Sequence, residues 1–153
     1  MKKKLKKKKL FLKNKIINVF IKSGKKKTGE KILLKFVKAF QKLNNKKFIS
    51  LFQLAIINVT SIFSLKTQVV KKGKRKVTKD VPSFFSDHSF RVSNSLNLLK
   101  RSVVKDKKTA YFYEMLVKEV LNSSSLNSSS VLIHNEVQNK ILLNKRYWSN
   151  FRW

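Results

Sequence analysis

The stretch from Leu65 to Pro82, LKTQVVKKGKRKVTKDVP, constrains the fold of this chain more than any other segment. Its two arms, residues 67–70 and 76–81, are rich in valine and threonine, which favour extended backbone. Gly73 lies between the arms and suits a tight turn between paired strands. The pattern predicts a β-hairpin with a cationic tip made of Lys71, Lys72, Lys74, Arg75 and Lys76.

A cationic hairpin of this kind needs a partner, because a two-stranded hairpin is marginally stable in water and like charges at its tip repel each other. The chain has 37 Lys and Arg residues against 7 Asp and Glu, a formal net charge of +30. Such a charge opposes compaction, whereas a surface that only confers solubility mixes both signs. The sequence therefore favours a polyanionic partner, with nucleic acid as the first candidate and an anionic membrane surface as the second.

Apolar residues at helical spacing predict a helical body around the hairpin. The predicted helices span residues 14–23, 28–43, 48–60, 88–105, 109–122 and 134–147, with Thr28 and Thr109 as N-caps. The second and third of these helices carry phenylalanines at helical spacing, which indicates core packing rather than stacking on bases. These phenylalanines are Phe36, Phe40, Phe48 and Phe52. In the fourth helix we expect Phe90, Leu96, Leu99 and Val103 to face inward, and Arg91, Lys100 and Arg101 to face outward.

The predicted fold class is mainly α: a single domain of five to six helices with a protruding β-hairpin between the third and fourth helices, plus a basic N-terminal arm. The lysine block 1–13 is the arm, which we expect to be disordered without a polyanion, and residues 14–153 form the domain. The serine-rich run Asn122–Ser130 has the composition of a flexible linker. The ending NKRYWSNFRW combines aromatic residues with arginine, which suits contact with RNA or a neighbouring protein.

Several functional classes are excluded by composition and spacing. The chain has no cysteine, which excludes disulfides, thiolate zinc sites and cysteine nucleophiles. His88 and His134 lie far apart, and the acidic residues are scattered, so that no metal site or general base is indicated. We therefore predict no catalytic residue, no metal and no cofactor. No run of about 18 apolar residues indicates a transmembrane helix, and we recognise no signal or transit peptide.

Four short motifs, taken together in their order, resemble one protein family. The first is a helix end with a glycine-lysine-lysine turn, the second an Ala-x-x-Asn-Val helix end, the third a Val-Pro pair closing the hairpin, and the fourth an aromatic-arginine-tryptophan ending. The matching residues are Ser23–Thr28; Ala55, Asn58 and Val59; Val81 and Pro82; and Phe151, Arg152 and Trp153. Over about residues 14–153 the chain thus resembles the small-subunit ribosomal protein seven family, of the bacterial and organellar type.

The chain departs from the family pattern at two places. The last helix in the family begins Lys-Arg-Glu with a histidine three residues on, whereas here Glu136 follows His134 and Asn135, and Asn139 replaces that histidine. The family's arginines around the start of the fourth helix are mostly replaced, and Arg91 is the clearest that remains. These departures bear on individual rRNA contacts rather than on the class of protein.

The resemblance implies a structural protein of the small ribosomal subunit that binds the 3′ major domain of small-subunit rRNA and helps assemble the head. It also implies neighbouring small-subunit proteins as partners and a hairpin near the exit-tRNA site and the mRNA path. The candidate rRNA-binding residues are Lys25, Lys26, Lys27, Lys71, Lys72, Lys74, Arg75, Lys76, Arg91, Arg101, Lys145, Arg146, Arg152 and Trp153.

Two other classes compete with this interpretation. A non-specific binder of nucleic acid or anionic membranes needs only charge and amphipathic helices, but it has no use for a charged finger, and we therefore expect no membrane partner. A nuclease would need a metal site or a general base, and the scattered acidic residues of this chain indicate neither. The abundance of Lys, Asn, Ile and Phe is typical of an A+T-rich genome. It favours an organelle-encoded protein of the mitochondrial ribosome, with a plastid or the bacterial cytoplasm as the alternative.

Overall fold

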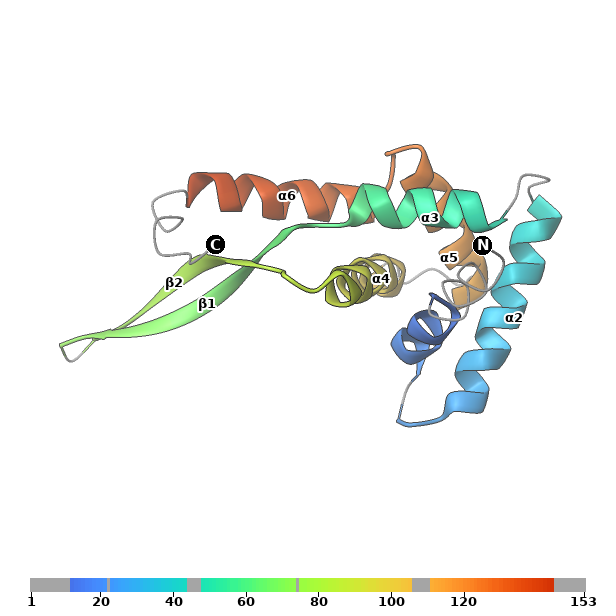
Figure 1. Cartoon of the computed structure of the whole chain (residues 1–153), viewed down its shortest axis with the longest axis horizontal. Helices are drawn as coiled ribbons and strands as arrows, with labels where there is room; N and C mark the ends of the chain where they lie inside the picture. The colour runs from blue at the N-terminus through green and yellow to red at the C-terminus, as the bar shows by residue number, and fades with distance from the viewer. Residues whose placement is uncertain (1–11, 22, 44–47, 74, 106–110, 145–153) are drawn as a thin grey trace.

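A computed structural model describes residues 12–21, 23–43, 48–73, 75–105 and 111–144. A helical segment over residues 12–20 comes first. It is followed by α2 (Lys26–Leu43), α3 (Phe48–Val59), β1 (Phe63–Lys72), β2 (Arg75–Phe84), α4 (His88–Lys105), α5 (Phe112–Ser124) and α6 (Ser129–Leu143). Figure 1 shows the helices gathered into one body from which β1 and β2 project. The predicted fold class, mainly helical with a hairpin between the third and fourth helices, is confirmed.

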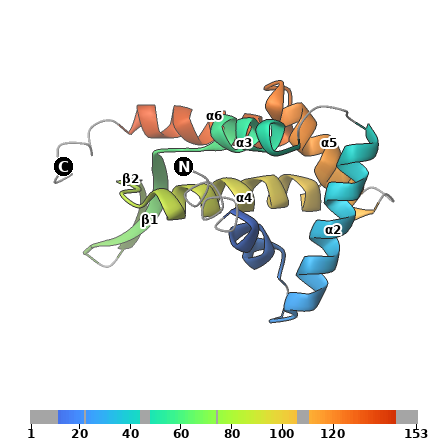
Figure 2. The same ribbon diagram turned by 45° about the vertical axis from the view of Figure 1, so that its right-hand side comes forward.

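Helix α5 lies at the centre of the body, in contact with α2, α3 and α4. Its residues Leu116, Val117 and Val120 are at most 2% exposed, and their spacing of one, three and four residues places them on one broad face. Helices α3, α4 and α6 also contact one another, and Figure 2 shows α3 and α6 along the same side of α4. The hairpin therefore projects from a body of mutually packed helices.

The four phenylalanines predicted for the core form an aromatic cluster between α2 and α3. Phe36 and Phe40 are fully buried, and Phe52 is 1% exposed. Phe36 contacts the rings of Phe40, Phe48 and Phe52 in edge-to-face arrangements, with centroids 5.5 to 6.3 Å apart. Such pairs add to the free energy gained from burial, so the prediction that these rings pack in the core is confirmed.

Several predicted helix ends are corrected. Helix α2 begins at Lys26, and the Thr28 hydroxyl donates to the carbonyl of Lys25 at 2.5 Å, so Thr28 lies inside the first turn and is not the N-cap. The last helix starts five residues earlier than predicted, at Ser129, and ends at Leu143. Residues 12 and 13, assigned above to the arm, belong to the first helical segment. Residues 1–11 of the arm and Thr109 lie outside the described residues.

The serine-rich run is not the flexible linker that its composition predicts. Ser123 and Ser130 are fully buried, and the Ser123 hydroxyl lies 3.0 Å from the hydroxyls of both Ser128 and Ser130. Ser128 is the N-cap of α6, where its Oγ accepts from the backbone N–H of Val131 at 3.2 Å. Serine hydroxyls can form hydrogen bonds with nearby side chains and backbone groups, and here these bonds order the short connection between α5 and α6.

A buried carboxylate and a partly buried side-chain amide stabilise this connection. Glu119, 7% exposed, accepts from the backbone N–H of Ser130 at 2.9 Å, where negative charge complements the start of α6. Asn58 Nδ2 donates to the carbonyl of Ser123 at 2.9 Å, at the end of α5. The Asn58 position of the Ala-x-x-Asn-Val motif thus links α3 to α5, while Ala55 and Val59 beside it are fully buried.

Candidate nucleic-acid interface

The hairpin extends beyond the helical body as a cationic arm (Figure 1). Its strands pair antiparallel from Phe63–Phe84 to Lys72–Arg75, and the described side chains between residues 66 and 80 are all exposed. Gly73 has a φ of 63°, as a two-residue hairpin connection requires. Both strands are longer than predicted, because paired valines continue the ladder to the tip. Lys71, predicted to lie between the runs, therefore stands on β1, where it pairs with Lys76 of β2.

Like charges face each other across the arm. Lys71 lies directly opposite Lys76, and Lys72 pairs with Arg75 in the next register position. Directly opposed like charges destabilise a pair of strands, and among the described residues no core covers this part of the arm to compensate. A row of phosphates would neutralise the opposed Lys71 and Lys76. The tip is therefore suited to a polyanion, and the candidate residues Lys71, Arg75 and Lys76 are exposed there.

An aromatic pair and a hydrogen bond join the two strands at the base of the arm, and a further hydrogen bond ties this base to the body. Phe63 and Phe84 pair across the strands with their centroids 5.7 Å apart, and the hydroxyls of Ser64 and Ser83 lie 2.8 Å apart. From α6, Gln138 Nε2 donates to the hydroxyl of Ser61, just before β1. These contacts fix the direction in which the arm leaves the body.

Arg91, predicted to face outward, helps to dock the arm. Its Nε donates to the carbonyl of Phe85 at 2.6 Å, and its guanidinium lies over the ring of Phe84, 5.2 Å from the centroid. The side chain is half-buried. Arginine carries five N–H donors, and the Nε bond uses one of them. Arg91 can therefore hold the hairpin base and still present its terminal amines to a phosphate.

Replacing Arg91 by lysine should loosen the arm. Lysine has no donor at the Nε position and no planar group to lie over Phe84. We therefore expect the free energy required to open the hairpin base to fall by about 1–2 kcal/mol. Amide hydrogen exchange of β1 and β2 measures this opening. Arg101→Lys is the matched control, because Arg101 is exposed on the same helix. Unchanged exchange in Arg91→Lys would show that this contact does not hold the arm.

A second group of cations lies at the start of α2. Ser23 and Gly24, with φ of 53° and 72°, turn the chain, and the exposed Lys25, Lys26 and Lys27 follow. The first turn of α2 contains no acidic residue. Positive side chains at the positive end of a helix dipole raise the local potential, which disfavours the free state and favours an anion. These three predicted residues are therefore placed together, as expected.

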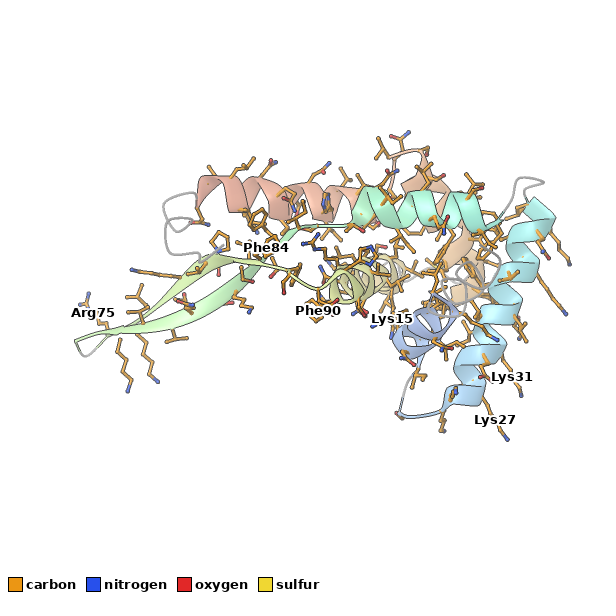
Figure 3. The ribbon with its side chains drawn as sticks, viewed as in Figure 1. Lys15, Lys27, Lys31, Arg75, Phe84 and Phe90 are labelled. Atoms are coloured by element: carbon orange, nitrogen blue, oxygen red, sulfur yellow. The ribbon has the colours of Figure 1, made fainter. Side chains whose placement is uncertain are left out.

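Helix α2 carries further lysines that the sequence analysis did not single out. Exposed lysines recur along it at spacings of three and four residues, which place them in one stripe on the helix surface. The stripe consists of Lys27, Lys31, Lys35, Lys38 and Lys42. Figure 3 shows Lys27 and Lys31 extending from the same side of α2. This spacing is present in the sequence, but the large number of other lysines makes it hard to distinguish there.

Tyrosine rings border this lysine stripe. Lys35 Nζ lies 5.8 Å from the centroid of the Tyr113 ring, and Tyr111 stacks on Tyr113 with their centroids 5.6 Å apart. Desolvation, and then the hydrogen bond and charge of Glu114, raise the pKa of Tyr113 above its usual value. The phenol therefore stays protonated at physiological pH, and it brings no negative charge to the cationic surface.

Some predicted positions lie apart from these surfaces. Lys100, expected to face solvent, donates through Nζ to the carbonyl of Val19 at 2.6 Å and so joins α4 to the first helical segment. Arg101 is exposed on α4, as predicted. The side chain of Lys72 is not described. The remaining candidates lie outside the described residues; they are Lys74, Lys145, Arg146, Arg152 and Trp153.

Neither a metal centre nor a membrane span is found in the part of the chain that the structure describes. No group of three or more His, Cys, Asp or Glu side chains there could hold a metal ion. Among the same residues, no helix combines the length and the apolar character that crossing a bilayer requires.

Two comparisons with known proteins find sequences similar to this chain. Residues 1–141 match the family model described as Ribosomal protein S7p/S5e. The small ribosomal subunit protein uS7 of Mycoplasma mobile is 28% identical to this chain over 142 residues, which cover 91% of this chain and 85% of that protein.

Proposed function

The chain belongs to the ribosomal protein S7p/S5e family and is a structural, non-enzymatic component of the small ribosomal subunit, and we propose that it binds the 3′ major domain of small-subunit rRNA through its cationic arm and the lysines of α2. Binding there would help to assemble the head of the subunit. The observation that carries this proposal is the exposed arm with its opposed like charges, since Lys71 facing Lys76 is unfavourable without phosphates nearby.

The spacing of the cations suits folded RNA. Arg75 lies at one end of the long axis of the molecule, and Lys27 and Lys31 lie towards the other end (Figure 3). Folded RNA is recognised mainly by its shape and backbone, and a rigid body with a projecting arm can contact separate parts of one such shape. A short duplex segment would contact only one of the two cationic groups at a time.

The same arrangement supports the finer partners expected of the protein. The arm reaches beyond the body, which would bring its tip close to other RNAs of the ribosome, the exit-site tRNA and the mRNA. Helix α6 leaves Leu132 64% exposed and Leu143 84% exposed, which suits contact with a neighbouring small-subunit protein. The helices and the hairpin would act together as one rRNA-binding domain, expected over residues 14–153 and preceded by the basic N-terminal arm.

For the cellular location we favour a mitochondrial ribosome. The support is the A+T-type residue usage of the chain. The relative named above is bacterial, which keeps the bacterial cytoplasm, with the plastid, as the alternative. Locating the gene on an organellar or a chromosomal genome decides between them.

The proposed function is tested by binding to an isolated 3′ major domain of rRNA, over a salt series, with duplex DNA as competitor. We expect tight binding that weakens steeply with salt, because phosphate contacts release counterions, and that excess DNA does not abolish. Binding that DNA of equal charge removes as readily as rRNA would contradict the proposal. It would indicate instead a basic protein that binds any polyanion.

A further inference from the structure

Two phenylalanine rings are exposed at the base of the arm. Phe84, the last residue of β2, is 43% exposed, and Phe90, in the first turn of α4, is 55% exposed. The sequence pattern predicted Phe90 on the inward face, and that prediction is wrong. Phe90 stands two residues from the buried Val92, so the two side chains point to opposite sides of the helix.

These rings are held in place from behind. The Phe90 ring packs against Phe85 with centroids 5.0 Å apart and planes at 61°. The Phe84 ring lies under the guanidinium of Arg91, which is itself tied to the carbonyl of Phe85. The exposed rings are thus backed by a fixed cluster, and a flat ligand would find them already oriented.

The rings lie between the two cationic groups of the protein. Along the long axis in Figure 3, Arg75 at the arm tip is followed by Phe84 and Phe90, and then by Lys15 and the lysines of α2. An RNA strand that follows this order from the arm to the helices passes the two rings. Aromatic side chains and arginine planes at such points are the usual partners of unpaired bases.

The charges around the rings are of both signs. The Asp87 carboxylate, three residues before Phe90, accepts from the backbone N–H of Ser89 at 2.8 Å, and the Arg91 guanidinium lies over Phe84. The rings can therefore take a neutral base while Arg91 meets the phosphate of the same nucleotide. We propose that Phe84 and Phe90, with Arg91 behind them, form a stacking site for unpaired nucleobases of the bound RNA. This proposal rests on the RNA-binding function proposed above and names its ligand at this site.

The test compares Phe90→Leu with the wild-type full chain on two probes, a single-stranded oligoadenylate and an RNA duplex of equal charge. Loss of one stacked base should weaken binding to the single strand about 5- to 50-fold. Binding to the duplex should not change, because its bases are already stacked on each other. The salt dependence should also stay the same, because no phosphate contact is lost. Phe90→Trp, which keeps an aromatic face, should bind the single strand at least as tightly as the wild type.

Val104→Ala is the control for loss of exposed apolar surface, since Val104 is 58% exposed in the last turn of α4, at the opposite end of that helix from Phe90. It should bind both probes like the wild type. Equal binding of Phe90→Leu and wild type to the single strand would overturn the stacking site, and so would an equal loss on both probes. A failure of rRNA selectivity appears elsewhere, in the wild-type competition with DNA, and overturns the proposed function instead.

Discussion

Removing three charges from the arm tip should lower rRNA affinity about 100-fold at 0.1 M salt. Lys71, Arg75 and Lys76 are exposed where like charges oppose each other, and we expect each to neutralise a phosphate. Each lost contact reduces the slope of log affinity against log salt by about 0.7–0.9, so the triple change to glutamine should reduce it by about 2–3. Filter binding or fluorescence anisotropy across a salt series measures both quantities.

The matched control removes the same number of charges from the body. Lys105, Lys118 and Lys140 are exposed on α4, α5 and α6, and changing all three to glutamine leaves the same net charge as the tip variant. If position matters, the control loses far less affinity than the tip variant. Equal losses in the two variants would show that only total charge counts. That result would refute a role for the arm.

The largest effect on stability is expected at the centre of the aromatic cluster. Phe36 is fully buried and packs edge-to-face on three other rings, so Phe36→Ala should lower the free energy of unfolding by about 3–5 kcal/mol. Domains of this size are stable by only about 5–15 kcal/mol, and a net charge of +30 works against compaction. We expect the variant without RNA to be largely unfolded at low salt and to regain helix when salt screens the charges.

Circular dichroism with urea titration at low and high salt measures this change. Leu34→Ala is the control on the same helix, because Leu34 is 63% exposed and its removal leaves no cavity. We expect it to unfold close to the wild type. If Phe36→Ala unfolded at the same urea concentration as Leu34→Ala, the aromatic cluster would not be the core that holds α2 and α3 together.

The sequence predicted those elements whose physical cause is local. Helix α4 has the predicted bounds, His88–Lys105, because its apolar residues recur at spacings of three and four. The hairpin lies where Val and Thr runs flank Gly73, and the buried phenylalanines follow a helical stripe. The candidate cations at the arm tip and the start of α2 could be named because charge is visible without a fold.

What the sequence did not reveal depends on contacts between distant residues. The buried serines of the α5–α6 connection look like a linker until the fold brings their hydroxyls together and the backbone N–H of Ser130 to Glu119. Arg91 and Lys100 were expected to face solvent, but both donate to backbone carbonyls that only the fold brings near. Composition counts polar groups, and it does not say which of them find a partner. The exposed Phe90 was missed for a local reason instead: it lies two residues before Val92 and so falls off the buried stripe of α4.

The central claim, that RNA lies against the arm and the start of α2, is tested most directly by lysine footprinting. The protein alone and the protein bound to the 3′ major domain of rRNA are acetylated briefly, and each lysine is quantified by mass spectrometry. We predict that Lys27, Lys31, Lys71 and Lys76 lose reactivity in the complex, while Lys118 and Lys140 keep it. Protection spread evenly over all six lysines, or strongest at Lys118 and Lys140, would contradict the account.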